Sequence, residues 1–130
     1  MKFLFVEDNA VNRRVVGEML KAGGIEMEEA EDGCLGLTKI EENNFDLVLM
    51  DLRMPRMDGL TAIRRIRARR DAKADLPIIV ITADNTANMR ADCVAAGAND
   101  IIEKPISMPV LFDAISRIIA SGYGGEATLV

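Results

Sequence analysis

The sequence has no histidine and no tryptophan, and it contains only two cysteines. The lack of histidine excludes a catalytic histidine, a histidine-ligated metal and a phosphohistidine on this chain. The two cysteines, Cys34 and Cys93, lie far apart in the sequence and match no spacing typical of a metal site. Each falls within a predicted helix, and we expect two free thiols rather than a disulfide.

Long apolar segments are also missing. No run of apolar residues approaches the roughly 18 that are needed to cross a bilayer. The opening segment MKFLFVED has a run of four apolar residues before two acids, which is too short for a secretory signal peptide. We therefore expect a soluble, cytoplasmic protein that has no membrane partner.

The charge of the chain is acidic and unevenly distributed. The net charge is −5, with 7 basic and 13 acidic residues at positions 1–60, and 9 basic and 8 acidic residues at positions 61–130. This balance argues against direct binding of nucleic acid. The segment RRIRARR at 64–70 is a local exception, which we interpret as the solvated face of a helix. The inner face of that helix would be Leu60, Ile63 and Ile66.

The chain does contain a regular alternation of short apolar runs and segments of helical period. With 130 residues, 49% of them hydrophobic, it is long enough for one domain. In the first predicted helix Val11, Val15 and Met19 share a face, and Gly23 follows as a stop. The predicted strands are KFLFV, IEMEEA, DLVLM, PIIVIT and NDIIEK, and the predicted helices cover about 10–22, 33–43, 59–70, 86–96 and 108–120.

Five such strand–helix units predict a doubly wound α/β fold, with a parallel sheet and helices on both faces. The first, third and fourth strands are continuously apolar, as strands that are covered on both faces must be, whereas the second and fifth resemble edges. The strand order 2-1-3-4-5 satisfies both observations. We expect one domain over residues 1–120 and a loose tail, SGYGGEATLV, over residues 121–130.

Several polar side chains are predicted to meet at the carboxyl ends of the strands, where open α/β sheets have their functional crevice. The side chains are those of Glu7, Asp8, Asp51, Thr82 and Lys104. Two unit charges about 4 Å apart repel by about 4 kcal/mol at an effective dielectric constant of 20. Three clustered carboxylates therefore persist if a cation neutralises them or if some of them are protonated. Oxygen ligands without nearby histidine or cysteine favour a hard cation such as Mg²⁺.

This set of groups suits phosphoryl transfer. A metal ion, the ammonium of Lys104 and the hydroxyl of Thr82 would surround a tetrahedral oxyanion and neutralise its charge. Asp51, which is central among these groups, would then be the nucleophile that becomes an aspartyl phosphate. A single acid at a strand end is commonly a solvated residue or a helix cap, and we interpret Asp58, before Gly59, as only a cap.

Other uses of the same fold fit this sequence less well. The first loop, EDNAVN, has no glycine, so it lacks the phosphate cradle of a dinucleotide site. Aspartyl phosphatases of the haloacid dehalogenase type usually carry a second aspartate two residues after the nucleophile, and that position is Arg53 here.

The motifs VEDN, MDLRMPRMDG, ITA and KP together resemble those of response-regulator receiver domains, over residues 1 to about 120. The resemblance implies a flavodoxin-like fold. It also implies Mg²⁺ bound by the side chains of Glu7, Asp8 and Asp51 and by the backbone carbonyl of Arg53. A histidine kinase or a histidine phosphotransfer protein would phosphorylate Asp51, and Thr82 and Lys104 would bind the phosphoryl oxygens. The opening VEDNAVN is most similar to receivers attached to, or partnered with, hybrid sensor kinases.

The resemblance also implies how the domain is regulated. Arg53 and Asp84 lie where the family tunes the access of water to the phosphoryl group, and Pro105 follows Lys104 with a bond that is usually cis. Ile101 replaces the usual aromatic switch residue, and the only tyrosine, Tyr123, lies in the tail. We expect an output surface on the fourth helix, the fifth strand and the fifth helix.

Such a domain would promote only its own phosphorylation and dephosphorylation, so we do not expect an enzyme in the usual sense. One alternative is a pseudo-receiver, an interaction module of the same fold that is never phosphorylated. A second is a magnesium-dependent phosphatase that acts on external substrates through an aspartyl phosphate.

Overall fold

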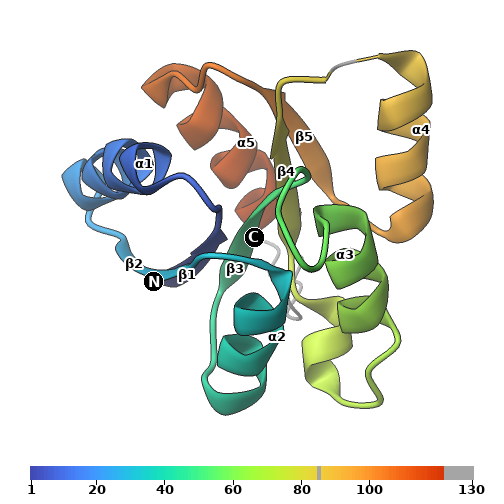
Figure 1. The fold of residues 1–130 in the computed structure, drawn as a ribbon. Coiled ribbons are helices and arrows are strands. Elements are labelled where there is room, and N and C mark those ends of the chain that lie inside the picture. Colours follow the sequence, from blue (N-terminus) through green and yellow to red (C-terminus); the bar gives the residue numbers. More distant parts are fainter. Residues whose placement is uncertain (85, 122–130) are drawn as a thin grey trace.

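The computed structural model describes residues 1–84 and 86–121, in which five strands alternate with five α-helices (Figure 1). All five strands are parallel and lie in the order β2-β1-β3-β4-β5, which confirms the predicted topology. Within the described residues no helix is long and apolar enough to cross a membrane. The elements are β1 (Lys2–Val6), α1 (Ala10–Ala22), β2 (Glu26–Ala30), α2 (Gly33–Glu42), β3 (Leu47–Asp51), α3 (Gly59–Arg67), η1 (Ala72–Asp75), β4 (Ile78–Thr82), α4 (Ala87–Ala96), β5 (Asp100–Glu103) and α5 (Met108–Ala120).

The sheet separates two apolar cores. Successive side chains of a strand point to opposite faces, so Phe5 and Leu49 pack with α1 and α5 on one face. Val6 and Met50 pack with α2, α3 and α4 on the other face. Figure 1 shows α1 and α5 on one side of the sheet, and α2 and α3 on the opposite side. Because β1, β3 and β4 are buried on both faces, the strand ends that carry polar residues rest on a rigid base.

Each of the five α-helices is preceded by an N-cap residue. The side chain of this residue accepts a hydrogen bond from the backbone N–H three residues later. A cap of this kind stabilises a helix by about 1 kcal/mol relative to alanine. Asp58 is one of them, as expected from the sequence. Each cap fixes the residue at which a helix begins after the preceding strand. The caps are Asn9, Asp32, Asp58, Thr86 and Ser107.

The apolar face noted in the first helix does not lie wholly against the sheet, although Met19 packs on the core. Val11 and Val15 are 61% and 44% exposed, whereas Val16 and Leu20 are buried against the sheet. Both pairs have the four-residue spacing of a helix face. The two faces are offset by one residue, which corresponds to a rotation of about 100° around the helix axis. The helix therefore leaves the apolar side chains of Val11 and Val15 on its outer surface.

The basic segment at 64–70 is also not wholly solvated, and α3 ends at Arg67 rather than at residue 70. The half-buried guanidinium of Arg67 ties the end of α3 to η1 and to the turn before β5. Its nitrogens donate, over 2.7–3.0 Å, to the backbone carbonyls of Ala74, Leu76 and Gly97 and to Oδ1 of Asn99. Arg67 thus has a structural role, because it joins these three segments.

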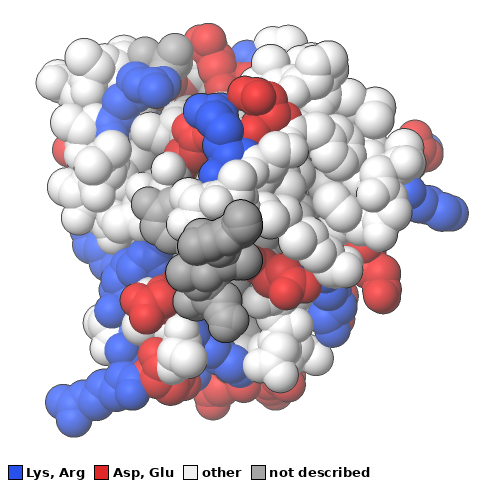
Figure 2. Space-filling view, turned by 180° about the vertical axis from the view of Figure 1, so that it is seen from behind, with Lys and Arg blue, Asp and Glu red and all other residues white. Residues whose placement is uncertain are grey.

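The mixed distribution of surface charge and the state of the two cysteines agree with the predictions from the sequence. On the face shown in Figure 2, basic and acidic side chains are interspersed, and neither sign forms a broad continuous patch. Cys34 is exposed, Cys93 is buried in α4, and both are free thiols. The predicted tail over 121–130 lies outside the described residues, apart from Ser121, which caps the end of α5.

Candidate functional site

Three carboxylates meet at the carboxyl ends of β1 and β3. Val6 and Met50 are paired in adjacent parallel strands, so the next residues, Glu7 and Asp51, leave the sheet at the same level. The side chains of Glu7 and Asp51 are buried, whereas Asp8 is exposed. One oxygen from each of the three carboxylates lies within 4.8 Å of the others. The structure therefore brings together the three acids that the sequence singled out.

Lys104 inserts its ammonium group between two of these acids. Nζ lies 3.1 Å from Oε1 of Glu7 and 3.3 Å from Oδ1 of Asp51. The backbone of Lys104 is held by its N–H, which donates to the carbonyl oxygen of Thr82, and the peptide bond to Pro105 is cis. Burial lowers the pKa of Lys104, but the carboxylates of Asp51 and Glu7 outweigh it, and the pKa lies above its ordinary value. Lys104 is therefore a permanent cation at this site.

The ammonium of Lys104 alone does not balance the charge of the three acids. Desolvation, together with the hydrogen bond and the negative charge of Glu7, raises the pKa of Asp8 above its ordinary value. Three carboxylates with one ammonium carry two uncompensated negative charges. A divalent cation with a preference for oxygen ligands matches both the charge and the donor atoms of this set. Glu7, Asp8 and Asp51 thus fit Mg²⁺.

Sequence reasoning missed the residues that orient Glu7. The N–H of Asn9 donates to Oε2 of Glu7 over 3.2 Å, because the cap of α1 turns the backbone toward that carboxylate. Arg13 donates from Nη1 to the backbone carbonyl of Glu7 and from Nε to Glu29 on β2, each over 2.7 Å. Asparagine is a residue type that helix starts favour, and Asn9 directly precedes the predicted helix, so this signal could have been used. The contacts of Arg13 depend on a strand pairing that no local pattern reports.

Thr82 ends β4, and its side chain is almost completely buried. Its Oγ1 accepts a hydrogen bond from the backbone N–H of Asp84 over 3.0 Å. A hydroxyl group can accept and donate at the same time, so its hydrogen remains available to an acceptor. β4 lies next to β3, with Ile81 paired to Asp51. This pairing places Thr82 on the strand beside the carboxylate.

Arg53 and Asp84, at the predicted regulatory positions, do meet. Nη2 of Arg53 lies 3.5 Å from Oδ2 of Asp84, and the side chain of Arg53 is 80% exposed. An exposed pair at this distance contributes less than about 1 kcal/mol to stability. The pair bridges the loops that follow β3 and β4. Ile101, at the third regulatory position, is half-buried and packs against the core beneath α4.

Two hollows flank the acidic cluster. One of about 450 Å³ is bounded by Asp8 and by the apolar side chains of Met54, Leu60 and Met89. A second, of about 350 Å³, is lined by Glu7, Asn12, Val15, Val16, Lys104, Pro105 and Ile106. The charged groups therefore lie between two partly apolar surfaces.

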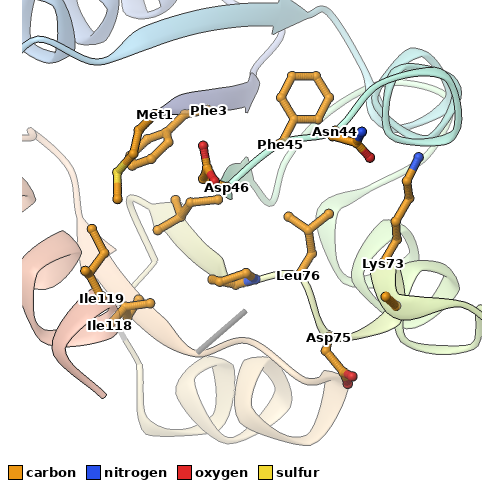
Figure 3. Close-up of a pocket in the computed structure, with 13 residues that line it drawn as sticks. Met1, Phe3, Asn44, Phe45, Asp46, Lys73, Asp75, Leu76, Ile118 and Ile119 are labelled. Atoms are coloured by element: carbon orange, nitrogen blue, oxygen red, sulfur yellow. The ribbon is translucent and has the colours of Figure 1, made fainter. Parts of the chain in front are cut away.

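A further cavity of about 360 Å³ lies at the opposite end of the sheet, near the start of β1 and β3 (Figure 3). Figure 3 shows Phe3, Phe45, Leu76 and Ile118 around it. The carboxylate of Asp46 accepts from the N–H of Lys2 and is thus used in holding the strands. Among the described residues that line it, this cavity has no convergent set of catalytic or metal-binding groups, in contrast to the acidic cluster.

The arrangement matches a known family. The family model for the response regulator receiver domain matches residues 3–116. The chain is 35% identical, over 130 residues, to the osmosensing histidine protein kinase of Saccharomyces cerevisiae, and 34% identical, over 121 residues, to the hybrid signal transduction histidine kinase M of Dictyostelium discoideum. These alignments cover 95% and 89% of this chain but only 10% and 5% of the respective relatives. The chain thus spans a small part of the relatives that it matches.

Solved structures agree with this assignment. The receiver domain of a sensor histidine kinase from Pseudomonas aeruginosa PAO1, which has a magnesium ion coordinated in its active site cleft, is 36% identical with a TM-score of 0.82. That match covers 89% of this chain and 94% of that one. The chemotaxis protein CheY4 of Vibrio cholerae is 28% identical with a TM-score of 0.85, and the match covers 90% and 97% of the two chains. This chain therefore belongs to the response regulator receiver domain family of two-component signalling.

Proposed function

We propose that this domain accepts a phosphoryl group on Asp51 from a histidine kinase or a histidine phosphotransfer protein, in the presence of Mg²⁺. The observation that carries the proposal is the position of Asp51. Its carboxylate is buried at the end of a rigid strand, beside two other acids and 3.3 Å from an ammonium group. The similarity to receiver segments of histidine kinases, and to a receiver that has magnesium in its active site cleft, supports it.

The proposed reaction is a single displacement at phosphorus. An oxygen of Asp51 attacks the phosphorus of a phosphohistidine, a P–O bond forms, and the P–N bond breaks with its electron pair returning to the imidazole nitrogen. Mg²⁺, when held by Glu7, Asp8, Asp51 and the backbone carbonyl of Arg53, supplies positive charge that offsets the charge on the transferred group. Lys104 offers a second positive charge. Water later attacks the phosphorus and releases inorganic phosphate, which regenerates the carboxylate.

Thr82 would donate its hydroxyl hydrogen to a phosphoryl oxygen. The hydroxyl oxygen is already held by the N–H of Asp84, which leaves the hydrogen as the available bonding group. Drawing Thr82 toward the phosphoryl group pulls on the loop that leads into α4. The buried residues of this helix are Cys93 and Ala96, so it is held by less apolar area than α3 or α5.

The phosphodonor would dock on the apolar rim beside the acids. Val15 of α1 and Ile106 of the β5–α5 loop share a hollow with Glu7 and Lys104. Val11 and Val15 leave exposed apolar surface that the fold of this domain does not use. A helix from the donor that covers these side chains would bring its phosphohistidine over Asp51.

We propose α4, β5 and α5 as the surface that a downstream partner reads. Val94 on α4 is 67% exposed, and Met108 and Val110 at the start of α5 are 40% and 51% exposed. These apolar groups lie on the elements that the movement of Thr82 would reach. Ile101 is stiff at its first side-chain torsion and has no hydroxyl, so we expect it to stay in one rotamer.

The experiment is intact mass measurement after incubation with acetyl phosphate and Mg²⁺. Addition of one phosphate to the parent, and none to Asp51→Asn, supports the proposal. Equal labelling of the Asn variant would contradict the assignment of Asp51. A parent that is never modified would indicate the pseudo-receiver alternative. Steady turnover of a generic aryl phosphate would indicate a phosphatase instead.

A further inference from the structure

A buried carboxylate lies beneath the loop that follows Asp51, outside the acidic cluster. Asp32 is 1% exposed, and its Oδ1 caps α2 by accepting from the N–H of Leu35 over 2.9 Å. Its Oδ2 is buried and accepts no hydrogen bond of good geometry within the described residues. Nε of Arg56 nevertheless lies 3.2 Å from this oxygen. The negative charge of Asp32 is therefore offset by proximity to Arg56 rather than by an aligned hydrogen bond.

Arg56 has an unusual backbone. Its φ is +68°, and it is the one non-glycine residue with a positive φ among the described residues. The N–H of Met57 donates to the carbonyl of Pro55 over 2.7 Å, so Arg56 is the central residue of a γ-turn. The form of this turn with positive φ is rare and strained, and a side chain at that position disfavours it. Something in the surrounding structure must hold Arg56 in this conformation.

The loop from Leu52 to Asp58 is seated between two close contacts. At one side, a Cβ added to Gly33, the first residue of α2, would lie 2.8 Å from the carbonyl oxygen of Met57. At the other side, the N–H of Gly59 donates to the carbonyl of Leu52 over 3.0 Å. Met57, near the end of the loop, thus packs on Gly33, which follows Asp32. The loop begins at Leu52, which follows Asp51. A shift of the γ-turn would move the whole segment.

We propose that Asp32 and Arg56 are a positioning pair, which holds the strained γ-turn and thereby sets the loop that presents the backbone carbonyl of Arg53 to Mg²⁺. The inference rests on the proposed function for the role of that carbonyl. Neither residue touches the metal site directly. The charge of Asp32 holds the guanidinium, the guanidinium holds the turn, and the turn holds the loop beside Asp51.

The first test uses metal-free protein. Arg56→Gln removes the charge and keeps a side chain at the strained position, so the loop should loosen. Amide hydrogen exchange at Gly59, which is bonded to Leu52, should become faster than in the parent. Asp32→Asn keeps the cap on α2 and removes only the charge, and it should have the same effect. Unchanged amide exchange at Gly59 in both variants would overturn the inference, whatever their affinity for Mg²⁺.

The second test measures the affinity for Mg²⁺ by NMR titration. Arg56→Gln and Asp32→Asn should each weaken binding roughly fivefold, less than the 10- to 100-fold effects of residues bonded directly to metal ligands. The double variant should be no weaker than either single variant, because both remove one interaction. Two independent, additive losses would overturn the pairing.

Arg56→Gly provides the decisive control. Glycine adopts positive φ without strain, so the turn should form without the ion pair and Mg²⁺ affinity should return close to that of the parent. A general loss of stability would predict a glycine variant at least as impaired as Arg56→Gln, and that result would count against the proposal. Failure of the proposed function would be seen separately, as a parent protein that acetyl phosphate does not modify.

Discussion

Replacing Asp8 with alanine should raise the melting temperature of the metal-free protein and remove most of the effect of Mg²⁺ on it. The carboxylate oxygens of Asp8, Glu7 and Asp51 lie within 4.8 Å of one another. Two unit charges at this separation repel by about 3.5 kcal/mol at an effective dielectric constant of 20, and by about 0.9 kcal/mol in water. Asp8 is exposed, so the lower figure applies to each of its two acidic neighbours.

Lys104 attracts Asp8 and offsets part of this repulsion, as its effect on the pKa of Asp8 indicates. We therefore expect Asp8→Ala to stabilise the metal-free domain by about 1 kcal/mol, or about 4 °C. In Mg²⁺ at ten times its dissociation constant, the parent should gain about 1.4 kcal/mol by mass action, and Asp8→Ala should gain little. In Mg²⁺ the difference in melting temperature between Asp8→Ala and the parent should therefore become smaller or change sign.

The assay is thermal unfolding followed by circular dichroism, with and without Mg²⁺ at constant ionic strength. Glu18→Ala, which removes an exposed acid in the middle of α1, is the matched control and should respond to Mg²⁺ as the parent does. If Asp8→Ala melts at a lower temperature than the parent without metal, or if Mg²⁺ stabilises both proteins equally, the electrostatic reasoning is wrong.

Three further predictions follow from other contacts. Alanine at both Arg53 and Asp84 should change the rate of dephosphorylation and leave the melting temperature nearly fixed, because the pair is exposed; an unchanged lifetime of the phosphorylated form would refute this. Beryllofluoride, a phosphoryl mimic, should shift the NMR signals of residues 86–96 while Ile101 keeps its rotamer, and an unmoved α4 would refute it. Arg67→Ala should lower the free energy of unfolding in urea by about 3 kcal/mol, because it leaves three part-buried carbonyls without this donor; a loss below about 0.5 kcal/mol would show that water replaces the guanidinium.

The strand order could be predicted because continuous apolar runs distinguish strands that are covered on both faces from edge strands. The convergence of Glu7 and Asp51 followed from that order, since adjacent parallel strands end at the same edge. The inner face of α1 could not be chosen in the same way. Val11 with Val15, and Val16 with Leu20, have equal spacing, and only packing against the sheet decides between them.

Contacts between segments that are distant in the sequence were also beyond prediction. In the sequence Arg67 cannot be distinguished from the surface arginines around it. Its role depends on the carbonyl oxygen of Gly97, 30 residues later, to which it donates. Arg56 likewise gives no sign of its positive φ, because the conformation depends on the buried charge of Asp32 and on the close approach of Met57 to Gly33. Local patterns predict elements and strand ends, whereas the residues that fix the loops depend on the assembled fold.

The caps at the starts of the five helices have an electrostatic consequence for the whole molecule. Because each of the five α-helices in the described residues follows a strand, their amino termini, each equivalent to roughly half a positive charge, lie on the same edge of the sheet as Asp51. The backbone alone thus polarises the domain along its strands, whatever side chains occupy the loops. For a phosphoryl group that approaches this edge, the helix ends contribute a favourable field that opposes the negative charge of the clustered carboxylates.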